Sequence, residues 1–139
     1  MATTETQWPG EWMRGVLSLC VLGVVARGRT YGYAIAAELS QAGLGSVKGG
    51  TLYPILTRLE ADGYVESSWG AGESGPGRKF FRATPAGHRH LAERTSQWRT
   101  FATRAASLLP PDDPDPDDPD PDHPTRTAGG PTDTTGAIR

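Results

Sequence analysis

The sequence predicts a mostly α-helical fold with a small β-hairpin: a winged helix-turn-helix domain followed by a C-terminal dimerisation helix. Three observations favour this fold. Two short amphipathic helices are joined by a glycine-containing turn over residues 30–62. Two short strand patterns flank a glycine-rich segment at 70–77. A long apolar stripe at helical spacing then runs through residues 85–109.

The length of 139 residues suits one domain with tails. We expect an unstructured N-terminus at 1–10, a winged-helix domain at 11–84 and a dimerisation helix at 85–109. Residues 110–139 are rich in Asp and Pro and predict an unstructured acidic tail.

The first two helices are predicted at residues 11–26 and 30–42. The first is apolar nearly all round, which predicts burial against its own core and against something else, such as a second subunit. Thr30 can cap the second helix, and Gly43 can end it.

The third helix is predicted to begin between Lys48 and Thr51 and to end near Asp62, with Gly63 after it. Because proline lacks an N–H, either this helix begins around Thr51 or it is kinked at Pro54. One buried face is predicted from four apolar residues at helical spacing: Leu52, Ile55, Leu56 and Leu59.

The wing is predicted as strands at 64–69 and 78–83 around the glycine-rich tip. Val65, Ser67 and Trp69 alternate with their neighbours, as expected for a half-buried ribbon.

Thr84 and Pro85 predict the start of the last helix, as an N-cap residue and a first-turn proline. Nothing else in so short a domain can cover its apolar stripe, so a second copy of the chain is the expected partner. The predicted dimer contacts are Leu91, Trp98, Phe101, Ala105 and Leu108.

Charge is divided unevenly along the chain. The net charge is -2, but residues 1–109 hold 12 basic and eight acidic residues, and the tail is acidic. A basic body favours a nucleic-acid partner. The tail either aids solubility or competes with DNA for the basic surface.

Cellular location is indicated by the single cysteine and by the absence of a membrane or export signal. Cys20 cannot form an intrachain disulfide, and it reads as a small core residue. The apolar run at 16–26 is too short to span a membrane, and the N-terminus does not resemble a secretion signal. We therefore expect a cytoplasmic protein.

Six motifs, in order and at matching spacings, resemble the PadR family of bacterial transcriptional regulators across residues 11–109. The resemblance implies a dimeric DNA-binding repressor, with dimer contacts from the C-terminal helix and often a small-molecule effector. Ala34 departs from the pattern, since an acidic residue is usual there, and the last helix is shorter than in long-tailed members. The motifs are Tyr31-Gly-Tyr33, Gly50-Thr-Leu-Tyr-Pro54, Arg58-Leu-Glu60, Gly63-Tyr-Val-Glu66, Gly75-Pro-Gly-Arg-Lys-Phe-Phe-Arg82 and Thr84-Pro-Ala-Gly87.

Candidate DNA contacts lie on the outward side of the third helix, at its entrance and in the wing. Tyr53 could instead pack against the second helix, and Arg58 could pair with a nearby acid. Arg78 and Lys79 could be an ordinary exposed strand end. The full predicted set is Tyr33, Ser46, Lys48, Gly50, Thr51, Tyr53, Arg58, Arg78 and Lys79.

Trp98 has two interpretations, as an anchor of the dimer seam or as a ring that stacks on a flat aromatic effector. The family resemblance implies a pocket between the first and last helices. Its candidate walls are then Trp12, Met13 and Thr95, beside Trp98.

The sequence predicts neither an enzyme nor a metal or cofactor site. His88 and His90 lie two residues apart, which is not a helical metal-ligand spacing, and no catalytic motif is present. We expect a homodimeric repressor that binds double-stranded operator DNA and responds to a small aromatic or apolar effector. The alternatives are a protein-interaction module with the acidic tail as docking segment, and a ligand-binding protein without DNA function.

Overall fold

The computed structural model describes residues 8–71 and 77–112. The chain divides into two units, Met1–Arg104 and Ala105–Arg139. Part of the predicted wing tip and most of the predicted acidic tail lie outside the described residues. The elements in chain order are α1 (Gly10–Val25), β1 (Thr30–Tyr31), α2 (Gly32–Gln41), α3 (Gly49–Ala61), β2 (Val65–Gly70), β3 (Arg78–Ala83) and α4 (Pro85–Ala106).

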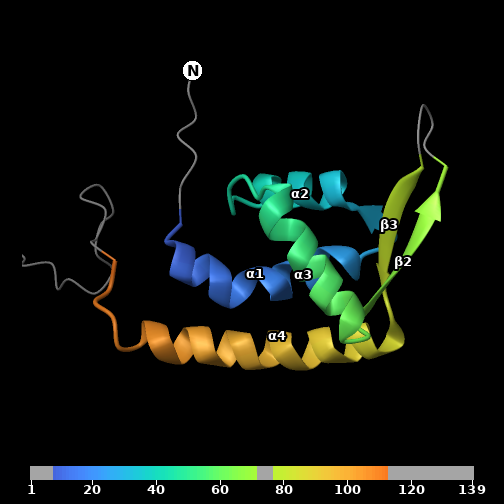
Figure 1. The fold of residues 1–139 in the computed structure, drawn as a ribbon. Coiled ribbons are helices and arrows are strands. Elements are labelled where there is room, and N and C mark those ends of the chain that lie inside the picture. The colour runs from blue at the N-terminus through green and yellow to red at the C-terminus, as the bar shows by residue number, and fades with distance from the viewer. Residues whose placement is uncertain (1–7, 72–76, 113–139) are drawn as a thin grey trace, which may run out of the picture. The chain divides into compact units, whose positions relative to one another are not determined.

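The predicted mostly helical winged fold is confirmed. Helices α1, α2 and α3 pack around one core, and the wing strands stand beside them (Figure 1). The predicted inner face of α3 is buried at Leu52, Leu56 and Leu59, while Ile55 is partly buried. The other buried apolar residues are Leu17, Val21, Leu22, Val24, Val25, Ile35, Leu39, Val65 and Phe81.

Glycines end α2 and α3 as predicted. Gly43 and Gly63 have φ values of 89° and 82°, a left-handed conformation that favours glycine because it lacks a Cβ. At each site the next amide reaches back into the helix, from Leu44 to the Leu39 carbonyl at 3.0 Å and from Tyr64 to the Leu59 carbonyl at 2.9 Å. Both helices therefore stop abruptly, which fixes where the following segment begins.

The sheet has three strands in the order β1-β3-β2, rather than the two of a hairpin. Thr30 pairs with Phe81 and Tyr31 with Phe80, so the predicted role of Thr30 as the cap of the second helix is wrong. Antiparallel pairing with β3 and burial of Thr30 prevail over the local preference of threonine for a helix cap. Helix α2 begins two residues later than expected, at Gly32.

Helix α3 begins at Gly49, and Pro54 lies inside it, past the first turn. This start lies within the predicted range from Lys48 to Thr51, but the alternative of a helix that begins only around Thr51 is wrong. Proline at this position removes the amide that would otherwise bond the Gly50 carbonyl. Burial of the Leu52 face holds the helix together across this missing hydrogen bond.

The wing strands β2 and β3 are paired in register from Val65 opposite Ala83 to Gly70 opposite Arg78. Val65 is buried and Ser67 half-buried, as the alternation predicted, but Trp69 is 73% exposed. Trp69 is not among the residues that pack against the core.

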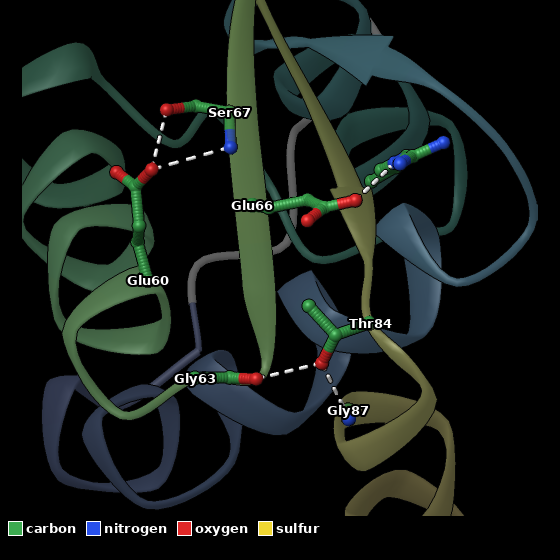
Figure 2. Close-up of polar contacts among 7 residues, drawn as sticks. Glu60, Gly63, Glu66, Ser67, Thr84 and Gly87 are labelled. Atoms are coloured by element: carbon green, nitrogen blue, oxygen red, sulfur yellow. Dashed lines mark hydrogen bonds and ion pairs between the residues drawn. The ribbon is translucent and has the colours of Figure 1, made fainter.

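A polar junction joins α3, the wing and the start of α4 (Figure 2). The Thr84 hydroxyl donates to the Gly63 carbonyl at 2.6 Å and accepts from the Gly87 amide at 3.0 Å, which confirms Thr84 as the N-cap of α4. The Glu60 carboxylate accepts from the hydroxyl and the amide of Ser67. Helix α3 is thereby tied to both the wing and α4.

Close packing at Gly87 completes this junction. A Cβ built on Gly87 would overlap the carbonyl oxygen of Tyr64. The Tyr64 ring stacks on His90, with centroids 4.0 Å apart and planes 8° apart. Helix α4 thus starts from a fixed position beside the end of α3.

Helix α4 ends at Ala106, earlier than the expected Leu109. Of its predicted dimer contacts, Leu91 packs against the chain's own core, whereas Trp98 and Phe101 are 43% and 68% exposed. Ala105 is exposed, and Leu108 lies beyond the helix and is also exposed.

Candidate nucleic-acid interface and apolar pocket

A pocket of about 420 Å³ lies where α2 begins, beside α3 and the wing. Four of the predicted DNA contacts meet there: Tyr33 from α2, Tyr53 from α3, and Arg78 and Lys79 from β3. They come from three elements spread over nearly fifty positions of the chain. Tyr31 and Gly32 complete the lining.

Tyr53 sits over the start of α2. A Cβ at Gly32 would overlap the Tyr53 hydroxyl oxygen, so the absence of a side chain at Gly32 is what lets the ring approach. The Tyr53 ring therefore packs against the start of α2, and its side chain is still 50% exposed. Its hydroxyl lies near the backbone at the first turn of α2.

The first turn of α2 leaves its amides without a side-chain cap. Tyr31 occupies the N-cap position and makes no capping hydrogen bond. The first amides of a helix have no partner within it and carry a partial positive charge, so they attract anions. Beside them Tyr33 is 81% exposed. The pocket therefore offers donors and positive potential but no acidic lining residue.

Aromatic rings hold the cations at the wing. The Arg78 guanidinium lies 4.1 Å from the centroid of the Tyr31 ring, and Arg29 lies 3.7 Å from that of Phe80. Tyr31 and Phe80 meet edge to face at 5.8 Å. Such cation–π contacts restrict the conformations of a flexible arginine side chain. The sequence analysis missed Arg29 and Tyr31, because β1 was not expected.

The remaining predicted DNA contacts do not line this pocket. They are exposed in the α2–α3 turn and along α3: Ser46, Lys48, Gly50, Thr51 and Arg58. Among the described residues, no acidic side chain pairs with Arg58. A Cβ at Gly50 would meet nothing within 4 Å, so packing within the chain does not require glycine there.

A second pocket, of about 620 Å³, is apolar and lies between α1, α4 and the turn after α2. Three of the four predicted effector residues line it, namely Trp12, Met13 and Trp98, whereas Thr95 does not. Sequence reasoning missed Trp8, which lies one helical turn before Trp12 in the sequence. It also missed the remaining lining residues, Glu11, Gly15, Val16, Leu44, Phe101 and Ala102.

A smaller pocket, of about 320 Å³, lies further along α1 and α4. Trp98 and Phe101 border it too, together with Leu19 of α1 and His90 and Arg94 of α4. Trp98 and Phe101 border both pockets, so the two pockets adjoin along α1 and α4. Both rings are only partly covered.

The arrangement of helices, wing and long last helix is shared with known proteins. The family model described as the transcriptional regulator PadR-like family matches residues 21–93, more than half of the chain. The chain belongs to the PadR-like family of transcriptional regulators. The matched span runs from α1 through the helix-turn-helix and wing into α4.

Relatives support this membership. Transcriptional regulator Rv3488 of Mycobacterium tuberculosis is 41% identical over 83 residues, covering 60% of this chain and 76% of the relative. A PadR family regulator from Eggerthella lenta shares 37% identity at a TM-score of 0.65, covering 71% of this chain and 86% of that chain. Bacillus subtilis PadR in complex with operator DNA has the same fold, with a TM-score of 0.53 at 23% identity, covering 58% of this chain and 46% of that chain.

Three further features of this PadR-like regulator bear on its chemistry. Burial raises the pKa of the half-buried Cys20 thiol, so less of the reactive thiolate forms at a given pH. In residues 8–71 and 77–112, no group of three or more His, Cys, Asp and Glu could hold a metal ion. Within the same residues, no helix is long and apolar enough to cross a bilayer.

Proposed function

We propose that this PadR-like regulator is a cytoplasmic homodimeric repressor that binds double-stranded operator DNA. The observation that carries the proposal is the pocket at the start of α2, where Tyr33, Tyr53, Arg78 and Lys79 converge on uncapped helix amides. Hydroxyls, amides and cations together suit a phosphate group. Bacillus subtilis PadR, which shares the fold, binds operator DNA.

In this proposal the phosphate pocket sets the position of α3 on the duplex. With a backbone phosphate bound there, the exposed side of α3 enters the major groove, and Thr51 and Arg58 reach base edges or phosphates. The two glycines that start α3 let the backbone come close to the DNA. Lys48 and Ser46 contact the backbone at the entrance to the groove.

The dimer is formed through α1 and α4. Trp12, Trp98 and Phe101 expose large aromatic rings to water. A contiguous apolar surface of this kind marks a site of contact with another protein surface. Pairing of these surfaces about a two-fold axis would place the two α3 helices in successive major grooves, about 34 Å apart. Residues 11–84 then form the DNA-binding part, and α4 is the dimerisation helix.

The effector is a small, flat, mainly apolar molecule that binds in the larger apolar pocket. Trp12, Met13 and Trp98 supply aromatic and thioether surface for stacking, and Glu11 is the one charged residue in the lining. Such a ligand relieves repression only if it binds the DNA-free arrangement more tightly than the DNA-bound one.

The salt dependence of DNA binding tests the proposal. Duplexes enriched by the protein from a random-sequence pool would be labelled, and their affinity measured by fluorescence anisotropy from 50 to 300 mM KCl. With Arg78 and Lys79 of both subunits on phosphates, log affinity should fall with log salt at a slope of about -4 or steeper. A slope near zero would instead favour a protein-interaction module.

A further inference from the structure

The indole of Trp8 contacts the helix-turn-helix from outside it. Its Nε1–H donates to the carbonyl oxygen of Gly43 at 2.8 Å. The two residues are 35 positions apart, so the bond joins the segment before α1 to the turn between α2 and α3.

The conformation of that turn depends on Gly43. It is the left-handed residue that ends α2, and its amide bonds to the Ser40 carbonyl at 3.0 Å. The following residue, Leu44, returns its amide to α2, also at 3.0 Å. Six residues later the chain is already in α3, whose direction this turn therefore sets.

The same indole forms part of the apolar pocket. Trp8 and Trp12 lie with ring centroids 6.4 Å apart, tilted by 34°. Leu44 of the turn lines the pocket as well, together with the α4 residues Trp98 and Phe101. The pocket is thus linked to the turn in two ways, through the turn residue Leu44 in its lining and through the hydrogen bond from Trp8 to Gly43.

We propose that Trp8 is a positioning residue that couples the apolar pocket to the helix-turn-helix. A planar aromatic ligand that enters beside Trp12 and Trp98 takes the place of the Trp8 indole, and the bond to the Gly43 carbonyl is lost. The turn then loosens, and α3 is held less firmly. This inference rests on the proposed function of the pocket as an effector site.

The coupling is reciprocal and modest. If the ligand and the Trp8 bond exclude each other, the free energy that links them equals that of the bond. A neutral hydrogen bond near solvent corresponds to about a threefold to tenfold change in an equilibrium constant. Effects of that size on the opening of the turn are expected, and not its complete unfolding.

Amide hydrogen exchange of the full chain, without DNA, tests the inference. The probe is 1-anilinonaphthalene-8-sulfonate, which presents a flat naphthalene ring and carries one sulfonate group. In Trp8→Phe, which keeps a ring but loses the donor, exchange at the Gly43 and Leu44 amides should rise about threefold to tenfold. Saturating probe should raise the same amides in the wild type by a similar factor and change Trp8→Phe little further.

Trp12→Phe is the matched control, because it removes an indole from the same pocket without a bond to the turn. It should leave the Gly43 and Leu44 amides within about twofold of wild type and still allow the probe to raise them. Thermal melts of both variants check that each is folded.

Three results would overturn the inference: unchanged exchange in Trp8→Phe, a bound probe that leaves the turn protected, or failure of the probe to bind. Because no DNA is present, failure of operator binding is a separate observation. If the protein binds no duplex but its Gly43 and Leu44 amides exchange as predicted, the proposed function is contradicted and the coupling is supported.

Discussion

The start of α2 and the α1–α4 surface both expose aromatic rings, but in different company. Tyr33 and Tyr53 carry hydroxyls and share their pocket with Lys79 and an uncapped helix end. In the apolar pocket, Trp98 and Phe101 lie among mainly aliphatic and aromatic neighbours, and Glu11 is the one charged residue of its lining. Exposure alone therefore does not distinguish the two surfaces.

The chemistry around the rings determines which partner each surface can bind. When a phosphate binds beside a tyrosine hydroxyl, helix amides and cations, little free energy is lost. The hydrogen bonds that these groups made to water are replaced by hydrogen bonds to the phosphate. An indole or phenyl ring gains most when water is removed from its whole face. The first surface suits DNA, and the second suits another copy of the chain or an apolar ligand.

The largest effect on DNA binding is expected when the cations of the wing are removed. In the Arg78→Ala and Lys79→Ala double variant, DNA affinity at 100 mM KCl should fall about a hundredfold, and the salt slope should become shallower by about 3 to 4. The dimer should persist, since neither residue lies on α1 or α4. Anisotropy and sedimentation velocity measure the two effects, and an unchanged slope would exclude wing contacts with phosphate.

The proposed role of the α1–α4 surface in dimerisation is tested by Trp98→Ala. Loss of a central aromatic anchor should raise the dimer dissociation constant about thirtyfold or more. Sedimentation equilibrium measures it, with Thr95→Ala as a control one turn earlier on α4 that does not line the apolar pocket. Equal dimerisation of both variants would place the subunit contact elsewhere.

The hydroxyl oxygen of Tyr53 separates its proposed DNA contact from its packing role. Tyr53→Phe keeps the ring packed over Gly32 but removes the hydroxyl, so DNA affinity should fall about tenfold as a hydrogen bond to a charged phosphate is lost. The melting temperature should stay within about 2 °C. If stability falls and affinity does not, Tyr53 has only a packing role.

The smallest effect is expected at Gly50. Gly50→Ala adds a methyl group to open space in a helix, so the free energy of unfolding should rise by up to about 1 kcal/mol. DNA affinity should still fall about threefold, because the methyl group occupies space next to the DNA backbone. Denaturant melts at one protein concentration and anisotropy report the two changes. A gain in both would show that this backbone does not approach DNA.

Local sequence patterns were sufficient for the elements whose stability is local. The apolar spacing of Leu52, Leu56 and Leu59 predicted the buried face of α3, and Thr84 was identified as a cap from its own position. Gly43 and Gly63 were predicted as helix ends for the same reason, since a left-handed residue is a local demand.

What the sequence could not predict depends on contacts between distant segments. Strand β1 exists because Thr30 and Tyr31 pair with β3, about fifty positions later, and two residues give no periodic signal. The bond from Trp8 to Gly43 has no sequence pattern either. Of the DNA candidates, the sequence named Tyr33, Tyr53, Arg78 and Lys79 but not their common pocket, which depends on the absence of a side chain at Gly32.

Hydroxyl-radical footprinting on an enriched duplex tests whether one surface binds DNA while the other pairs two chains. We expect two protected stretches on one face of the duplex, with centres about 10 base pairs apart, and two chains per site by sedimentation. One protected stretch with a single chain bound, or no protection in dilute buffer, would contradict the proposal.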